Sequence, residues 1–416
     1  MKNTTILHIT DLHYNEPYGS PQIVGKDKNV TNGLINKISS NDCRESFISF
    51  ARYYNSSRKI DLVAFTGDLG WAADPESVER GADFLAKLAK DLSVSSRCVV
   101  VAPGNHDLNR DERDGKELEC FCRACEKRHF RYAHGEEPFI LDINNFKVVA
   151  LNSCLGGTER AIKGVPDDYW KIIQKTLSVQ KKKLYDSGTL SRMDSDLRFQ
   201  LEAMDIPAIG IKQLEQCNEV ISRSSADFFV LLMHHNLIPA TNIEIRAYAS
   251  SVDAGRTLSR LLNYERYIMV LHGHSHTNIG LRLQRLKDDK PGYVACIGNR
   301  GLSPRPDSEA SIIEIMTTDD GNFVRAETYN ITRNGTEYES SFNYMLSARP
   351  DQTLNPTWSF CTLPKGVPMS FAELAKKLNV PKTDKLAKEL IQLDAVLVNV
   401  TNKQRSPKYW QITRKI

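Results

Sequence analysis

The chain of 416 residues is too long for one small core, and its length predicts two or three domains. Apolar residues make up 41% and charged residues 25% of the sequence, a composition that excludes a disordered chain. The net charge of +4 is mild but unevenly placed: residues 351–416 hold 11 Lys and Arg against 5 Asp and Glu, whereas residues 1–350 hold 44 against 46.

The N-terminal sequence runs from Met1 into the short apolar stretch Ile6–Ile9 without the features of a secretory leader. No later stretch approaches the roughly 18 consecutive apolar residues of a membrane span. The nine cysteines are an odd number spread through a large chain, which favours reduced thiols in a cytoplasm. We therefore expect a cytoplasmic protein without membrane contact.

One local cluster, Cys120, Cys122 and Cys125 with His129, admits two interpretations. Its C-x-C-x2-C spacing suggests zinc, but no second C-x2-C pair follows that would close a tetrahedral site. The alternative is a packed helix with buried thiols, which the helical context favours.

The first part of the chain alternates β-branched apolar runs with helical periodicity, which predicts strands separated by helices. The predicted strands are Thr4–Thr10, Asp61–Gly67 and Arg97–Gly104. The predicted helices are one that Asp42 caps and that runs to about Asn55, and a second over Glu76–Leu92.

Three further strands are predicted over Asn145–Ser153, Asp227–His235 and Tyr267–His272. From Asn278 to about Tyr338 the chain is rich in strand-forming residues, and Asp319–Asn322 has the composition of a hairpin turn. Helical connections followed by hairpins imply two packed sheets with helices outside them.

Residues 158–206 interrupt this pattern with a polar, helical stretch. We interpret it as an insertion between core strands, on the side of the motif loops. A substrate cap, an oligomer contact and a decorated surface all stay open as its role.

The C-terminal part has its own pattern: we place a proline-containing linker at residues 346–368 and a small domain at residues 369–416. Helix, turn, helix and hairpin is the outline of a winged helix. Its basic residues either contact nucleic-acid phosphates or form a solvated face of a docking or dimerisation unit. The predicted elements are helices over Phe371–Leu378 and Lys385–Leu393 and a hairpin of Val396–Val400 with Tyr409–Thr413.

Ionisable residues recur at the ends of the predicted strands. Asp11 and His13 stand two apart after the first strand, and extended chain sends residues two apart to the same face, so both can reach one ion. His274 and His276 repeat this spacing after the strand that ends near Leu271.

Three other blocks follow strands in the same way. Asp68 comes directly after a glycine, and from there its carboxylate can bridge two cations. Asn105 and His106 lie just past the next strand. His234 closes a later strand, and the adjacent His235 is expected to point to the opposite face if that strand continues.

Together the five blocks resemble the calcineurin-like metallophosphoesterases, whose pattern is D-x-H, G-D, G-N-H-D or E, a single H and G-H-x-H. The resemblance covers roughly residues 1–340 and implies a four-layer α/β/β/α sandwich, which we place at residues 1–345 with the helical insertion at about 158–206. One departure is Asn236 after His235, where many relatives have proline. The matching blocks are Asp11-Leu12-His13, Gly67-Asp68, Gly104-Asn105-His106-Asp107, His234 and Gly273-His274-Ser275-His276.

The resemblance also implies roles for these residues. His106 would not be a ligand: it would face the scissile phosphate and either stabilise charge or protonate the leaving oxygen, while Asp107 would orient its imidazole. The implied metal ligands are Asp11, His13, Asp68 and His276 for one ion, and Asp68, Asn105, His234 and His274 for the other.

Two divalent cations about 3.5–4 Å apart clamp a phosphate and turn a bridging water into a hydroxide for in-line attack. Nitrogen and oxygen ligands without thiolate favour Mn, Fe, Zn, Co or Ni, and the imidazoles disfavour Mg. We expect Mn²⁺ first among these cofactors.

We therefore expect an enzyme, a two-metal phosphoesterase that hydrolyses phosphodiester bonds in nucleic acid, to which the basic C-terminal part would bring it. The first alternative is a cyclic-nucleotide phosphodiesterase, and the same scaffold also hosts phosphomonoesterases and protein phosphatases. The alternative from another class is a nucleic-acid-binding or complex-assembly protein that uses the domain as a platform. A protein partner or self-association would use the C-terminal domain or the insertion.

Overall fold

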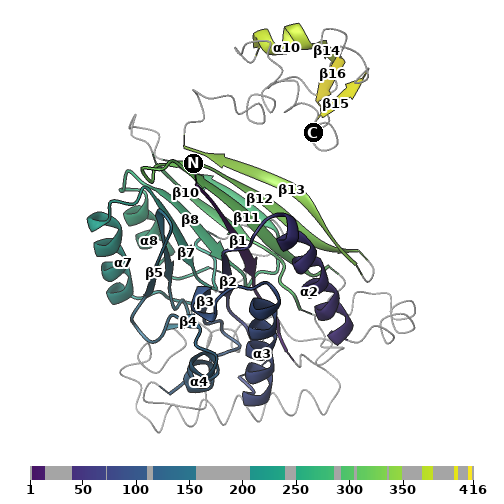
Figure 1. Cartoon of the computed structure of the whole chain (residues 1–416). Helices are drawn as coiled ribbons and strands as arrows, with labels where there is room; N and C mark the ends of the chain where they lie inside the picture. The colour runs from purple at the N-terminus through teal and green to yellow at the C-terminus, as the bar shows by residue number, and fades with distance from the viewer. Residues whose placement is uncertain are drawn as a thin grey trace, which may run out of the picture.

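The computed structural model describes residues 2–14, 40–71, 73–109, 116–155, 207–238, 250–284, 292–303, 307–334, 337–348, 368–377, 398–401 and 411–414. Within these residues the chain forms two packed β-sheets with helices on both outer faces, which confirms the expected α/β/β/α sandwich (Figure 1). The expected insertion, most of the linker and the second C-terminal helix lie outside the described residues.

The first sheet has seven strands in the order β13-β12-β11-β1-β2-β3-β4. Its β1–β4 half is parallel, and β11, β12 and β13 add antiparallel strands on the other side of β1. The hairpin turn expected at Asp319–Asn322 joins β11 to β12, with Gly321 at φ 87°. The strands are β1 (Lys2–Ile9), β2 (Leu62–Thr66), β3 (Val99–Ala102), β4 (Arg131–Tyr132), β11 (Glu309–Thr317), β12 (Phe323–Asn334) and β13 (Glu337–Ser347).

The second sheet has six strands in the order β5-β6-β7-β8-β10-β9. Its four central strands are parallel and its two edge strands antiparallel. The strands are β5 (Phe139–Ile143), β6 (Phe146–Ala150), β7 (Phe228–Leu232), β8 (Tyr267–His272), β9 (Ile279–Leu283) and β10 (Tyr293–Gly298).

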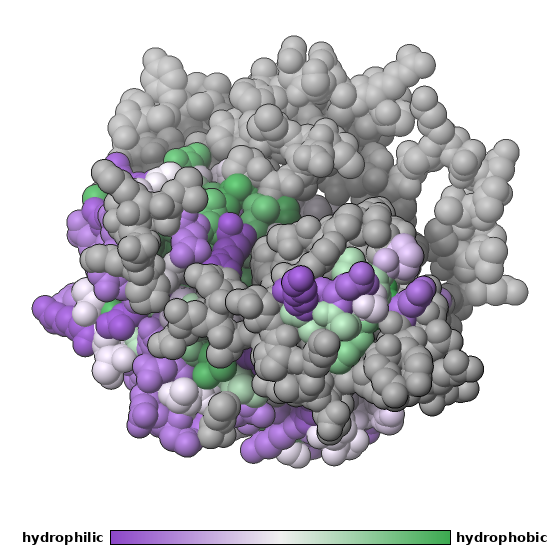
Figure 2. All heavy atoms as spheres, turned by 90° about the horizontal axis from the view of Figure 1, so that it is seen from above, coloured by the Kyte–Doolittle hydropathy of each residue, from purple (hydrophilic) through white to green (hydrophobic). Residues whose placement is uncertain are grey.

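Buried parallel strands explain the continuous apolar runs of the sequence, since both of their faces are covered. In β1, Ile6 lies in the apolar cluster between the sheets and Leu7 in the cluster beneath the helices of the first sheet. In β7, Val230 faces the first sheet, and Leu231 lies in the cluster that holds residues of α7 and α8. On the face shown in Figure 2, the described residues along the lower edge are mainly hydrophilic, and hydrophobic side chains gather in smaller clusters nearer the middle.

The helices lie in two groups: α2 (Ser40–Ser57), α3 (Pro75–Asp91) and α4 (Glu119–Lys127) cover the first sheet, and α7 (Ile211–Arg223) and α8 (Ala254–Leu261) cover the second. Helix α3 begins at proline directly after Asp74, whose carboxylate accepts the Ser77 N–H at 2.8 Å. None of the described helices is long and apolar enough to cross a bilayer.

Two sequence predictions of local structure need correction. Helix α2 begins at Ser40, so Asp42 lies within its first turn and is not the cap. The start of the strand predicted over Arg97–Gly104 is a short 3-10 turn, η2 (Ser96–Cys98), because the Ser95 hydroxyl accepts the Arg97 N–H and turns the backbone before β3.

The C-terminal residues form a separate three-stranded sheet of order β14-β16-β15, and the expected hairpin is its β15–β16 pair. Strand β14 was not expected, because its first residue, Pro368, belongs to the predicted linker. Ser370 and Glu373 exchange hydrogen bonds as a capping box at the start of α10. The elements are β14 (Pro368–Ser370), α10 (Phe371–Lys377), β15 (Val398–Thr401) and β16 (Gln411–Arg414).

Candidate metal centre

The predicted site residues follow the carboxyl ends of parallel strands in both sheets. Strands β1, β2 and β3 of the first sheet and β7 and β8 of the second all run toward the same end of the sandwich (Figure 1). Parallel strands deliver the loops that follow them to one edge, where a site can form. The residues delivered there are Asp11, His13, Asp68, Asn105, His106, Asp107, His234, His274 and His276.

The first group of donors combines Asp11, His13 and His276. Nε2 of His13 lies 3.6 Å from Oδ1 of Asp11 and 3.3 Å from Nε2 of His276. Nε2 of His276 lies 3.8 Å from the same oxygen of Asp11. Ligands of one ion with bonds of about 2.1 Å lie roughly 3–3.5 Å apart, so one of the three distances falls in this range and the other two exceed it slightly. Small shifts of these side chains would let them share a cation.

The second group of donors combines Asn105, His234 and His274. Oδ1 of Asn105 lies 2.9 Å from Nε2 of His234 and 3.2 Å from Nδ1 of His274. Two imidazole nitrogens thus lie within 3.2 Å of one amide oxygen.

Asp68 lies between the two groups. Its Oδ2 is 3.7 Å from Nε2 of His13 and 3.3 Å from Nε2 of His234, while Oδ1 accepts the His106 N–H at 2.8 Å. One oxygen therefore faces both groups and the other is held by the backbone. This is the geometry that a bridging carboxylate needs.

Hydrogen bonds on the outer side of two imidazoles fix which nitrogen faces the centre. Nδ1 of His234 lies 2.7 Å from the Thr66 carbonyl, and Nδ1 of His276 lies 3.0 Å from the Arg300 carbonyl. A carbonyl can only accept, so both Nδ1 atoms carry the proton. In each neutral ring Nε2 then offers its lone pair to the centre, as metal-binding histidines require.

The backbone of the ligand loops is not the extended chain that the spacing suggested. Asp11 and His13 have φ values of 51° and 42°, and His274 and His276 have 65° and 47°. Because β1 ends at Ile9 and β8 at His272, each pair lies beyond its strand, and left-handed residues turn its side chains inward. The residues meet as expected, but by a different backbone path.

Glycines let these loops approach one another closely. Gly67 has φ 97°, a conformation that favours glycine. A β-carbon on Gly104 would lie 2.1 Å from Oδ1 of Asp68, and one on Gly273 would lie 2.3 Å from Oδ2 of Asp11. The motif glycines therefore make room for the carboxylates beside them.

The charges of the centre also favour cations. Burial alone would raise the pKa of Asp11, but His276 and His13 hold it below its ordinary value, and histidines do the same for Asp68. For His234, burial acts to lower the pKa, but the Asp68 carboxylate outweighs it and raises the pKa to about 10. The Asp11 and Asp68 carboxylates are thus held in the ionised form, and their negative charge favours a bound cation.

One buried atom tests directly whether a metal fits. Oδ2 of Asp11 accepts hydrogen bonds from the Thr10 hydroxyl and the His274 N–H, but no group in the described part of the chain donates a hydrogen bond to Oδ1, which is fully buried. A buried carboxylate oxygen without a donor is costly unless a cation binds it. The donor set therefore fits divalent ions.

A family model of the calcineurin-like phosphoesterases matches residues 4–278. The chain belongs to this family. The chemistry of the family is the hydrolysis of phosphoesters at a dinuclear metal centre, and the clusters of Asp and His described above are candidate ligands for it. No curated protein is significantly similar to the chain.

Solved structures show low identity and modest TM-scores. A dimetal phosphatase from Danio rerio is 14% identical with a TM-score of 0.47, over 82% of this chain and 99% of that one. A purple acid phosphatase from yellow lupin is 13% identical with a TM-score of 0.44, over 83% of this chain and 54% of that one. A calcineurin-like phosphoesterase from Bacillus subtilis is 11% identical with a TM-score of 0.35, over 85% and 92% of the two chains.

In this calcineurin-like phosphoesterase, His106 lies beside His13 of the first donor group and beside Asp68. Its ring centroid is 4.9 Å from that of His13, at 86°, and 4.4 Å from that of Trp71, at 18°. Its side chain is partly exposed, whereas most of the ligand set is buried. Trp71 was not among the predicted site residues, because a single tryptophan three residues after Asp68 matches no motif of a metal or catalytic site.

The carboxylate of Asp107 contacts the backbone of two ligand loops. Its buried carboxylate accepts backbone N–H groups of Asp68 and Gly104, both at 2.9 Å, and of Leu69 and Gly70. Burial, and then the neighbouring Asp68, raise the pKa of Asp107 to about 7, while the N–H groups of Gly104 and Asp68 act to lower it. Through these backbone contacts Asp107 joins the loops that carry Asp68 and His106.

His235 was expected to point away from the centre, but its ring lies 4.5 Å from that of His274 and 5.0 Å from that of His234. Strand β7 ends at Leu232, so strand alternation no longer applies at this position. The Ser153 hydroxyl accepts the N–H groups of His234 and His235 and therefore donates its own proton to Nδ1 of His235, at 2.9 Å.

The cysteine cluster forms part of α4, with Cys125 fully buried in the apolar cluster next to the first sheet. Burial raises the pKa of the Cys125 thiol and raises that of Cys122 to about 12. The thiols on this face are thus held in the neutral form, which is a poor metal ligand.

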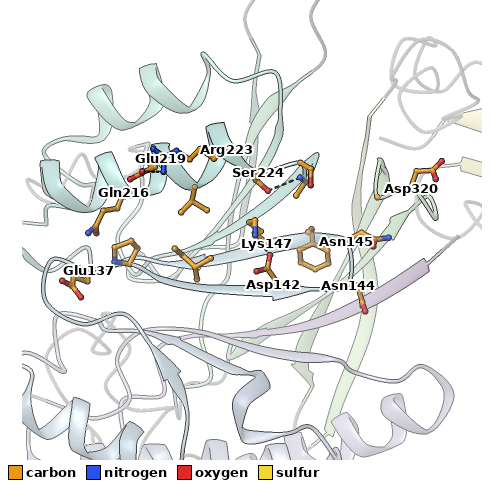
Figure 3. A pocket seen from close by; sticks show the side chains of 17 residues that line it. Glu137, Asp142, Asn144, Asn145, Lys147, Gln216, Glu219, Arg223, Ser224 and Asp320 are labelled. Carbon is orange, nitrogen blue, oxygen red and sulfur yellow. Dashed lines mark hydrogen bonds and ion pairs between the residues drawn. The ribbon is translucent and has the colours of Figure 1, made fainter.

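The phosphoesterase also has a pocket of about 850 Å³ between α7 and the β5–β6 hairpin (Figure 3). Its lining includes Asn145 and Asp320. Asp320 follows β11, whose Thr317 pairs with Lys2 at the start of β1, so this part of the pocket lies at the opposite end of the sandwich from Asp11. None of the lining residues belongs to the candidate metal centre.

Proposed function

We propose that this phosphoesterase is a two-metal phosphodiesterase that cleaves nucleic acid. The observation that carries the proposal is the Asp68 carboxylate, whose Oδ2 lies between two nearly equidistant groups of nitrogen and oxygen donors. A complete pair of donor groups, with a partly exposed imidazole beside them, supports catalysis rather than a platform role. Mn²⁺ is the ion that we propose first, because imidazoles and carboxylates together suit it.

The proposed ligands divide as the resemblance implied, with Asp68 shared. Two such ions, when bound, supply charge stabilisation for the phosphate and lower the pKa of a water for in-line attack. Asp11, His13 and His276 would hold one ion, and Thr10 and the His274 N–H keep the Asp11 carboxylate turned toward it. Asn105, His234 and His274 would hold the other.

His106 is the proposed catalytic residue. Because its backbone N–H is bound to Asp68 and its carbonyl accepts the Ala73 N–H at 2.6 Å, its Cα stays next to the bridging carboxylate. From there the imidazole can protonate the oxygen that leaves the phosphate. Asp107 supports this placement through the loops.

The C-terminal part is the proposed reason for a polymeric substrate. Residues 351–416 carry a surplus of six basic residues, and α10 with β14–β16 forms a unit around the buried Leu374 and Ile412. A strand and a hairpin in one sheet, with a helix beside them, support a winged-helix-like domain. The proposed linker then lies between β13, which ends at Ser347, and β14, which begins at Pro368. If the Lys and Arg side chains of the domain neutralise several phosphates, the affinity of the domain for nucleic acid depends on the salt concentration.

The test is a substrate screen of the purified protein with Mn²⁺ against bis-p-nitrophenyl phosphate, single-stranded DNA, duplex DNA, RNA and cyclic nucleotides. We expect turnover of the model diester and of at least one polynucleotide. Cleavage of cyclic nucleotides alone would replace the proposal with a cyclic-nucleotide phosphodiesterase. No turnover with any first-row metal would leave a binding or assembly protein.

Two substitutions separate metal binding from catalysis. His106→Ala should keep both ions and lose about 100-fold or more of kcat for diphenyl phosphate, whose basic phenolate leaving group needs a proton; this is the size expected of a lost general acid. Asp68→Ala should lose activity and bound metal together, because it removes the shared oxygen. Metal analysis beside kinetics decides the outcome, and a His106→Ala enzyme that stays fully active on diphenyl phosphate would remove the general-acid role.

A further inference from the structure

The ring of Trp71 makes the flattest aromatic contact in the candidate metal centre. Its indole stacks on the His106 imidazole at 4.4 Å and 18°. His13 meets both rings edge-on, at 4.9 Å and 86° for His106 and at 5.4 Å and 68° for Trp71. The imidazole of His106 thus contacts the face of the Trp71 indole, and its ring is nearly perpendicular to that of His13.

The backbone of Trp71 is anchored to the start of α3. The Trp71 backbone N–H donates to the Ser77 hydroxyl at 3.0 Å, and the Trp71 carbonyl accepts the Asp74 N–H at 3.1 Å. Two residues on, the Ala73 N–H donates to the His106 carbonyl. Trp71 therefore contacts His106 by its side chain and Ala73 contacts it by its backbone, and the capped start of α3 holds the Trp71 backbone in place.

We propose that Trp71 is a positioning residue for His106, an inference that rests on the proposed function. A proton donor is effective only while its nitrogen points at the leaving oxygen, and an imidazole on a partly exposed loop can otherwise turn about its side-chain bonds. Stacking against the indole limits that rotation.

The test compares two diesters that differ in their need for a proton. In bis-p-nitrophenyl phosphate the leaving p-nitrophenolate is stable without protonation, whereas diphenyl phosphate releases a more basic phenolate. Trp71→Ala should lower kcat for diphenyl phosphate about ten-fold more than for bis-p-nitrophenyl phosphate, with bound Mn²⁺ unchanged. Trp71→Phe keeps a stacking ring and should restore most of the loss. Tyr53→Ala, at an exposed site on α2, is the control for loss of an aromatic side chain.

The double variant Trp71→Ala, His106→Ala tests whether Trp71 acts through His106. If it does, adding Trp71→Ala to His106→Ala should cause no further fall in kcat, because residues that act as a unit are not additive. Additive losses, or an equal loss for both esters in the single variant, would overturn the proposal. Loss of manganese would overturn it as well, because it would show that Trp71 supports the His13 ligand instead.

A spectroscopic arm separates this inference from the proposed function. The indole ring current should shift the His106 imidazole protons upfield in the NMR spectrum, and Trp71→Ala should abolish the shift. If the shift is present but the wild-type protein cleaves neither ester with any first-row metal, the proposed function has failed while the contact stands. If the shift is absent, the positioning role itself is refuted.

Discussion

Glu309 is a carboxyl group that the fold keeps away from water. It is 1% exposed at the start of β11, where Oε1 accepts the Asn278 amide at 2.6 Å and Oε2 lies 3.7 Å from Nε of Arg300. Burial raises its pKa to about 7, although Arg300 acts in the opposite direction. The folded protein therefore favours the protonated form.

The direction of the shift fixes a pH dependence. A carboxyl whose pKa is raised on folding contributes stability below its unfolded value, near 4.5, and that contribution is lost as pH rises through about 7. Glu309→Gln keeps the acceptor oxygen and cannot ionise. At pH 8 we expect it to be more stable than the wild type by about 1–3 kcal/mol, with the gain shrinking toward pH 5.

Thermal unfolding of the metal-saturated proteins at both pH values measures this effect. The surface substitution Glu339→Gln on β13 is the matched control and should show no such trend. A Glu309→Gln protein that is no more stable at pH 8 would mean that the buried carboxylate is better paired than its contacts indicate.

The sequence was sufficient to name residues that the structure brings together at one edge of the sandwich, but not their exact geometry. The spacing of Asp11 and His13 showed that both could reach one ion, whereas their left-handed backbone depends on contacts with the loop after β2, such as the Asp11 N–H to the Gly67 carbonyl at 2.9 Å. The partners of Asp107 and the inward position of His235 likewise depend on loops distant in sequence. Single-residue patterns carry no information about such contacts.

At the scale of elements, the turn after β3 has no room for a side chain on Gly104. A side chain on Gly104 would meet both Oδ1 and the backbone N of Asp68, at 2.1 and 2.4 Å. Gly104→Ala should displace the carboxylate that faces both donor groups. We expect a loss of about 10–100-fold in metal affinity, as for other changes just outside a ligand shell.

Metal titration of the two proteins checks this prediction. Gly255→Ala in α8 is the control, because a β-carbon there meets nothing within 4 Å and alanine favours a helix. It should keep full metal affinity and the same or higher stability. A Gly104→Ala protein with wild-type affinity would show that the turn can shift without moving Asp68.

The elements themselves were predictable where the signal is local. Buried parallel strands such as β8 (Tyr267–His272) agree with their predicted bounds, since a continuous apolar run marks them. Boundaries set by hydrogen bonds of single side chains, as at Ser95 before η2, were not. Strand β14 was missed because it begins with proline and is only three residues long.

At the scale of the whole molecule, the basic C-terminal part is expected to add substrate affinity without taking part in the chemistry. Deleting residues 351–416 should leave kcat for bis-p-nitrophenyl phosphate unchanged. It should weaken binding to single-stranded DNA and flatten the dependence of affinity on salt, because fewer counterions are released. Fluorescence titrations at several salt concentrations measure both quantities.

A milder variant controls for effects of truncation. Replacing Lys376 and Lys377 of α10 by glutamine keeps the unit and removes two charges, so it should lower the salt slope by about two. If neither change alters nucleic-acid binding, the C-terminal part serves assembly with another protein or a second copy.

Strand order could not be predicted from the sequence, because pairing between distant segments leaves no local signal. Two sheets with outer helices followed from the alternation of strands and helices, but the place of β1 between β2 and β11 did not. That position has a consequence for synthesis on the ribosome. The edge of β1 that pairs with β11 stays unpaired until about 300 further residues have been synthesised. Asp11 and His13 are made first, but their partner His276 comes late, so a nascent chain cannot complete the site before most of its length exists.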